Sequence, residues 1–139
     1  MHILMCNDDG ILAPGLRRLG GYLSQYHRVT VVAPATEQSA KSHALTTEVP
    51  LKLEVHSEDS SNPRLYALTG TPSDCMKFGL SYLLADDMPD LVVSGINHGF
   101  NLGSDVLYSG TVSAAMESCF YGIPGLALSV ERYYDDSGD

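Results

Sequence analysis

Short apolar runs alternate along the chain with segments whose apolar residues recur at helical spacing. The apolar runs at residues 3–6, 29–33, 65–68, 90–94 and 126–130 have the length of buried strands. Between them, residues 16–26, 71–84 and 109–121 carry the signals of helices. Strands that alternate with helices are typical of an α/β protein. We therefore expect a three-layer, Rossmann-like, doubly wound and mostly parallel sheet.

Residues at the ends of these segments refine the expected elements. Thr71 is suited to cap a helix whose first residue is Pro72, and Asp74 then meets the positive end of the helix dipole. Gly122 is expected just beyond the end of the last helix, with Pro124 two residues later. Partial alternation over residues 45–55 predicts an extended β-ribbon insertion, and residues 95–108 read as a loop rich in Gly and Asn.

Size and composition limit the classes of protein that fit. With 139 residues and 15.0 kDa, the chain is expected to form a single domain over residues 1–139. Its 8 Lys and Arg against 17 Asp and Glu give a net charge of -9 without a basic cluster, so neither a nucleic-acid duplex nor a membrane surface is an expected partner.

The cysteines and the N-terminal segment indicate the compartment. Cys6, Cys75 and Cys119 are far apart and form no CxxC pair, so we expect neither disulfides nor a zinc site. All three are expected on core-facing positions. No apolar run reaches membrane-spanning length and no leader precedes the first strand, so the sequence favours an unprocessed cytoplasmic protein.

The polar segments that follow the predicted strands carry the candidate chemistry. Asp8 and Asp9 follow the first strand, and adjacent carboxylates are commonly accommodated by a divalent cation or by backbone donors. Residues 36–43 add hydroxyl groups, and residues 95–105 add Asn97, Asn101 and Asp105. The helix expected from residue 109 offers free N–H groups and hydroxyls that suit a phosphate. Together these features predict a metal and phosphate site.

Each feature also has a purely structural explanation. The acid pair can form a polar turn in which one carboxylate caps a helix, and Ser109 or Thr111 can be an ordinary N-cap. Other catalytic signatures are absent from the sequence: it has no P-loop, no GxGxxG turn after a strand, no HExxH motif and no nucleophile elbow.

Read together, these segments resemble the SurE family, the survival protein E type of 5′/3′-nucleotidase. The resemblance spans nearly the whole chain in order. It rests on Asn7-Asp8-Asp9-Gly10, Val32-Ala33-Pro34-Ala35 with Gln38-Ser39, Gly70-Thr71-Pro72-Ser73-Asp74-Cys75, Ser94-Gly95-Ile96-Asn97 with Gly99-Phe100-Asn101-Leu102-Gly103, and Tyr108-Ser109-Gly110-Thr111-Val112-Ser113-Ala114-Ala115.

The resemblance implies a metal-dependent phosphatase that acts on nucleoside 5′- and 3′-monophosphates. It implies one Mg²⁺ or Mn²⁺ per subunit, with a catalytic role for the acid pair and an acid/base role for Asp105. The implied metal ligands are Asp8, Asp9, Ser39 and Asn97, and the implied substrate and phosphate contacts are Asn97, Ser109, Gly110 and Thr111. It also implies a homodimer or homotetramer, and a C-terminal part, typical of the family, that is absent from residues 1–139.

Three other functions are weighed against this one. A response-regulator receiver domain would need a Lys after its last strand, where the sequence has Glu131-Arg132. A phosphatase with an aspartyl nucleophile would need Asp-x-Asp, whereas Asp8 and Asp9 are adjacent. A nucleotide-binding domain without catalysis remains open, because only turnover separates a binding protein from an enzyme.

Overall fold

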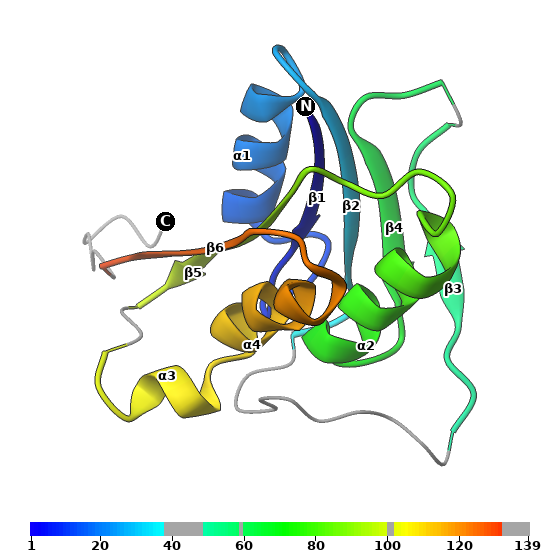
Figure 1. Cartoon of the computed structure of the whole chain (residues 1–139). Coiled ribbons are helices and arrows are strands. Elements are labelled where there is room, and N and C mark those ends of the chain that lie inside the picture. The colour runs from blue at the N-terminus through cyan, green and yellow to red at the C-terminus, as the bar shows by residue number, and fades with distance from the viewer. Residues whose placement is uncertain (38–48, 59, 100–101, 132–139) are drawn as a thin grey trace.

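A computed structural model describes residues 1–37, 49–58, 60–99 and 102–131. Within these residues, six strands form one sheet in the order β3-β4-β2-β1-β5-β6 (Figure 1). The strands are β1 (His2–Cys6), β2 (Arg28–Pro34), β3 (Leu53–Val55), β4 (Arg64–Leu68), β5 (Leu91–His98) and β6 (Gly125–Val130). Among these described strands, only β3 runs antiparallel to its neighbour, so the expected mostly parallel sheet is confirmed.

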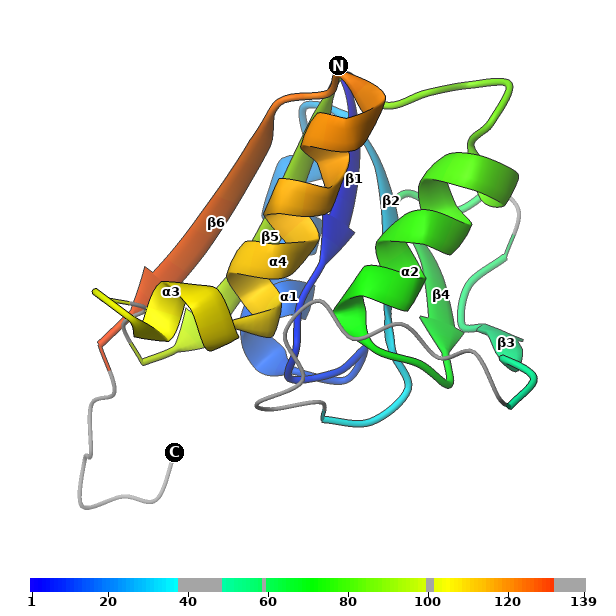
Figure 2. The same ribbon diagram turned by 60° about the horizontal axis from the view of Figure 1, so that its bottom comes forward.

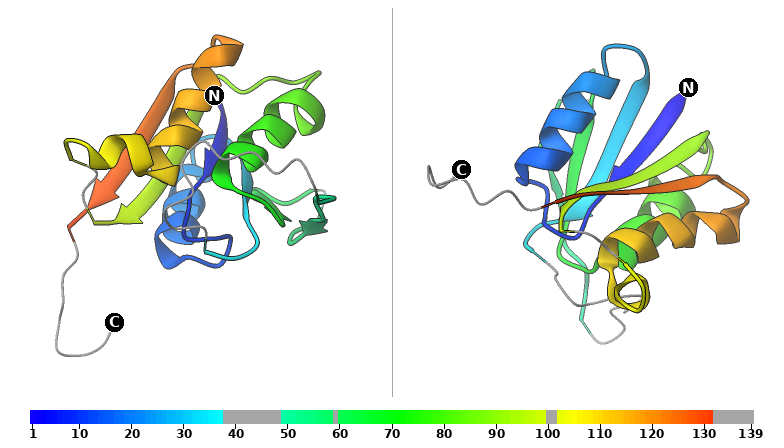
Figure 3. Two further views of the ribbon diagram at one scale, coloured as in Figure 1. Left: turned by 90° about the horizontal axis from the view of Figure 1, so that it is seen from below. Right: turned by 90° about the vertical axis from the view of Figure 1, so that its left-hand side faces the viewer.

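Helices cover both faces of this sheet. The helix α1 (Pro14–Leu23) lies on one face, and α2 (Pro72–Phe78) and α4 (Gly110–Glu117) lie side by side on the other (Figures 2 and 3). The predicted three-layer, doubly wound α/β fold is therefore confirmed. A short helix, α3 (Asp105–Tyr108), precedes α4, a π-helical turn η1 (Gly79–Leu83) extends α2, and a 3₁₀ turn η2 (Ser118–Tyr121) extends α4.

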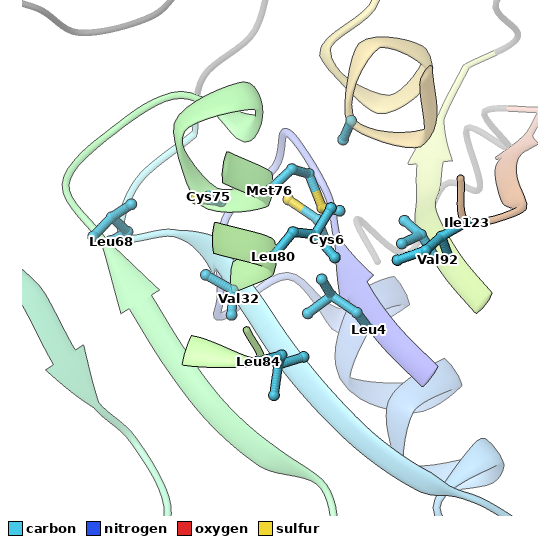
Figure 4. Packing of buried hydrophobic residues seen from close by; sticks show 11 residues of the cluster. Leu4, Cys6, Val32, Leu68, Cys75, Met76, Leu80, Leu84, Val92 and Ile123 are labelled. Atoms are coloured by element: carbon cyan, nitrogen blue, oxygen red, sulfur yellow. The ribbon is translucent and has the colours of Figure 1, made fainter. Parts of the chain in front are cut away.

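Alternate residues of the buried strands supply two hydrophobic cores. Leu4 and Val32 point toward α2 and α4, where they pack against Met76 and Leu80 (Figure 4). Their strand neighbours Ile3, Met5 and Val31 point to the opposite face and pack with Leu16 of α1. A strand covered on both faces is mostly apolar, which is why β1 and β2 read as nearly continuous apolar runs.

The residues that the sequence predicted at two helix ends lie at those ends in the structure. The Thr71 hydroxyl accepts a bond from the Asp74 backbone N–H at 3.2 Å, and the Asp74 carboxylate accepts one from the Thr71 N–H at 2.8 Å. This reciprocal pair is a capping box, with Pro72 following directly. After η2, Gly122 has a φ of 71°, the left-handed conformation that glycine adopts without strain.

One predicted loop and one predicted ribbon differ from the structure. The segment expected to be a loop from residue 95 continues as β5 up to His98, because β6 supplies hydrogen-bonding partners beyond a shift in register between Ser94 and Asn97. The same expected loop also contains α3. Of the ribbon expected over residues 45–55, the part that forms a strand within the described residues is β3.

The prediction for the cysteines was wrong at one position. Cys6 and Cys75 are buried in the core shared with α2, but Cys119 is exposed. Cys119 belongs to η2, where the chain tightens from an α-helix into a 3₁₀ turn and the helical spacing used to predict its orientation no longer applies.

Candidate functional site

The sheet order places the first acidic segment where open α/β sheets bind ligands. The order of the parallel strands reverses between β1 and β5, and ligands bind in the crevice outside the carboxyl ends of strands at such a point. Asp8 and Asp9 follow β1, and Asn97 lies near the end of β5. Figure 2 shows the first turns of α2 and α4 at the same edge, beside the segment that follows β1.

A tight turn fixes the two carboxylates. The buried Asn7 side chain donates to the Gly10 carbonyl at 2.9 Å and accepts from the Gly10 N–H at 3.2 Å. Gly10 has a φ of 103°, which residues with a Cβ rarely adopt, and the next residue, Ile11, donates to the Pro34 carbonyl at 2.8 Å. These bonds hold Asp8 and Asp9 between two anchored positions. Asn7 was not among the predicted site residues, although an Asn three positions before a Gly is a known turn signal.

Asp8 is a buried carboxylate that faces α4. The residue is 7% exposed, and its Oδ1 accepts a hydrogen bond of 3.0 Å from the Thr111 hydroxyl. Burial raises the pKa of Asp8; the Thr111 bond opposes this rise, and the nearby Glu37 carboxylate adds to it. Within the described parts of the chain, the ion pairs include none between a Lys, Arg or His and Asp8. A divalent cation would supply the missing positive charge.

The start of α4 lies directly against Asp8. A Cβ on Gly110 would be 2.9 Å from the Asp8 Cβ and 3.1 Å from the Pro72 Cγ, so only glycine allows this approach. Ser109 is the N-cap, and its hydroxyl accepts from the Val112 N–H at 3.2 Å. The capping role considered for Ser109 is thus present. The N–H groups of Gly110 and Thr111 belong to the first turn, which has no acceptors within the helix.

The remaining predicted residues are placed less completely. Asn97 is half-buried at the end of β5, and its side-chain Nδ2 donates to the Gly99 carbonyl at 2.9 Å, which leaves the orientation of the amide oxygen fixed. Ser39 lies outside the described residues, and Asp105 is described only by its backbone, as the first residue of α3. The structure thus brings Asp8, Gly110 and Thr111 into contact, and Asp9 directly follows Asp8 in the chain.

The predicted donor set suits a hard cation. No group of three His, Cys, Asp or Glu side chains comes together among the residues that the structure describes. The predicted ligands are instead two carboxylates, an amide and a hydroxyl, all of which offer oxygen, the atom that Mg²⁺ and Mn²⁺ prefer. A cavity of about 390 Å³ lies elsewhere, between α1 and the segment before β4, and none of the described residues that line it carries a carboxylate.

Fold and site together define a Rossmann-like α/β protein with an acidic turn and a helix N-terminus at the switch point of its sheet. The chain belongs to the SurE family: the sequence model described as "Survival protein SurE" matches residues 3–138. The resemblance inferred from the sequence is thereby confirmed.

No helix within the described residues is long and apolar enough to cross a membrane.

Related proteins agree with this assignment. The "5′-nucleotidase SurE" of Thermoanaerobacter sp. (strain X514) is 53% identical over 129 residues, which are 93% of this chain and 50% of the relative. The protein of the same name from Clostridium botulinum (strain Alaska E43 / Type E3) is 47% identical over 135 residues, 97% of this chain and 53% of the relative. The chain therefore spans about half the length of the curated relatives it matches.

A solved structure confirms the fold. The crystal structure of the SurE protein from Aquifex aeolicus superposes with a TM-score of 0.85 at 42% sequence identity. The match covers 97% of this chain and 53% of that one.

Proposed function

We propose that residues 1–139 contribute the catalytic unit of a divalent-metal-dependent phosphatase that hydrolyses nucleoside 5′- and 3′-monophosphates to nucleoside and phosphate. The observation that carries the proposal is the 3.0 Å hydrogen bond between Thr111 and Asp8. It joins a carboxylate suited to a cation to a helix start suited to a phosphate. The curated relatives named 5′-nucleotidase support the class of substrate.

Asp8, Asp9, Ser39 and Asn97 would hold one Mg²⁺ or Mn²⁺ ion per subunit. The buried Asp8 carboxylate fits this role, because it lacks a cationic side-chain partner among the described residues. When bound, such an ion polarises a phosphoryl oxygen and lowers the pKa of a coordinated water.

The first turn of α4 would bind the phosphate. The N–H groups of Gly110 and Thr111 point out of the helix start, where the dipole favours negative charge. Ser109 and Asn97 would add side-chain contacts to the substrate. As charge spreads over the phosphoryl oxygens during transfer, these fixed donors stabilise it without having to reorganise. Asp105 would carry the proton to or from the reacting oxygen, as general acid or base.

The same proposal covers assembly and location. We place the protein in the cytoplasm, where cysteines stay reduced, and all three cysteines of this chain are free. A homodimer or homotetramer is proposed from family membership.

Phosphate release tests the proposal directly. The assay uses a panel of 5′- and 3′-nucleoside monophosphates with Mn²⁺, with Mg²⁺ and with a chelator. We expect metal-dependent turnover by the wild type, none by Asp8→Asn, and full turnover by the control Asp86→Asn, which alters an exposed aspartate away from the site. A folded wild type that binds nucleotide and metal without turnover would contradict the proposal and leave a nucleotide-binding domain.

A further inference from the structure

The Thr111 hydroxyl already donates a hydrogen bond to another residue of the protein. The Thr111 residue is 0% exposed, and its Oγ1 donates to Asp8 Oδ1 at 3.0 Å. A threonine hydroxyl carries one hydrogen, so it cannot donate to Asp8 and to a phosphate at the same time. Contact between Thr111 and a phosphate is thus left to the backbone N–H of the residue.

Packing around Thr111 holds this bond in place. The β-branched side chain has few rotamers available in a helix. The next turn is tied back by the Ser113 hydroxyl, which donates to the Gly110 carbonyl at 3.0 Å, and Gly110 itself rests against Asp8 and Pro72. The first turn of α4 cannot move away from Asp8 unless this bond breaks.

We infer that Thr111 is a positioning residue for Asp8. Its hydroxyl fixes the rotation of the Asp8 carboxylate and occupies Oδ1, so that Oδ2 is presented to a cation. Its backbone N–H, in the same residue, belongs to the helix start that faces the phosphate. One residue thereby sets the distance between the metal ligand and the phosphate-binding turn. The inference rests on the proposed function for the presence of the metal.

The bond has the geometry by which outer hydrogen-bond partners tune metal ligands. Such partners orient the ligand, and their loss typically weakens metal affinity by about 10- to 100-fold. Replacement of the hydroxyl by a methyl group in Thr111→Val preserves the shape of the side chain and removes the donor. Thr111→Ser preserves the donor and removes a methyl group.

The test is a titration with Mn²⁺ in the absence of nucleotide, with free Mn²⁺ followed by electron paramagnetic resonance. We expect the dissociation constant for Mn²⁺ to rise by about 10- to 100-fold in Thr111→Val and to remain within about threefold of wild type in Thr111→Ser. Thr30→Val is the matched control. Thr30 is also buried, at 3% exposed, and bonds His2 Nε2 at 3.0 Å near the amino ends of the strands.

The outcomes separate the inference from the proposed function. If Thr111→Val binds Mn²⁺ like wild type, and Thr111→Val and Thr30→Val lose similar amounts of thermal stability, Thr111 is only structural and the inference fails. If Thr111→Val does not fold, Thr111→Ala is compared with Thr111→Ser, and equal Mn²⁺ affinities again overturn it. A wild type that binds no Mn²⁺ overturns it as well. Weakened Mn²⁺ binding in a chain that hydrolyses no nucleotide would refute the proposed function alone.

Discussion

Gly110 and Asp8, 102 positions apart in the chain, touch so closely that a single added carbon would not fit between them. A Cβ on Gly110 would lie 2.9 Å from the Asp8 Cβ, a separation that real Cβ atoms essentially never show. The obstacle is the short, anchored stem of Asp8 together with the Pro72 ring, and neither can rotate away as the end of a long side chain would. Close contact between the acidic turn and α4 therefore depends on this glycine.

Gly110→Ala is expected to destabilise the protein and to weaken the site. Overpacking of this kind typically costs about 1–3 kcal/mol, and displacement of α4 from Asp8 should also lower kcat/KM for nucleotides. Denaturant unfolding and the phosphate-release assay measure the two effects. The control is Gly21→Ala in α1, where a Cβ would meet nothing within 4 Å. It should stabilise the helix by about 0.5–1 kcal/mol, and a loss of stability equal to that of Gly110→Ala would count against the steric explanation.

Asp8→Asn is expected to abolish metal binding and to stabilise the metal-free protein at neutral pH. Burial raises the pKa of Asp8, so the folded state holds the Asp8 proton more tightly than the unfolded state does. The free energy of unfolding of the wild type therefore falls as pH rises from about 4 through the raised pKa, and stays lower above it. The Asn side chain in Asp8→Asn is neutral at every pH, so the variant does not lose this part of the free energy of unfolding.

Thermal unfolding in chelator, followed from pH 4 to pH 7.5, measures the effect. The advantage of Asp8→Asn over wild type should be present at neutral pH and vanish toward pH 4, while Asp86→Asn should follow the wild-type curve. A variant less stable than wild type across this range would show that the Asp8 charge is not costly in the fold.

His2→Gln is expected to flatten the loss of stability in mild acid. Burial, with the nearby Arg28 charge as the second cause, lowers the pKa of His2. Below about pH 6.5 the unfolded chain then takes up a proton at His2 more readily than the folded chain, so stability falls as pH drops. Glutamine stays neutral and retains a group that can bond Thr30, the present partner of His2 Nε2.

Unfolding midpoints at pH 7.5, 6.5 and 5.5 test this expectation against His27→Gln, which removes a histidine outside the core. Identical acid sensitivity in wild type and His2→Gln would rule out His2 as the source.

Cys119 is expected to be the one thiol that reacts rapidly in the native protein. Cys6 and Cys75 are 0% exposed, and burial, assisted by the neighbouring Cys6, raises the pKa of Cys75 well above its usual range. Titration with 5,5′-dithiobis(2-nitrobenzoate) should therefore show one fast thiol, lost in Cys119→Ser, and three in denaturant. Fast reaction of Cys119→Ser would mean that the core opens at Cys6 or Cys75.

Much of the fold could be predicted from local features of the sequence. The apolar run before Asn7 predicted β1, and the Thr71 cap and the glycine at 122 marked helix ends that the structure confirms. These signals work because a strand buried on both faces and a helix end each impose requirements on residues that are neighbours in the chain. For the same reason, the acid pair could be located at the end of β1 and therefore at the carboxyl edge of the sheet.

Other features could not be predicted from the sequence and became evident only in the tertiary structure. The extension of β5 past Gly95 depends on pairing with β6, and the partner of the Thr111 hydroxyl lies 103 positions away in the chain. Sequence spacing alone allowed Thr111 to be a cap or a phosphate contact; the packing of α4 on the turn after β1 decided that its hydroxyl donates a hydrogen bond to Asp8. The sequence thus determined which groups are available at this edge, and only the fold decided which of them meet, because contacts between distant segments are set by how the layers pack.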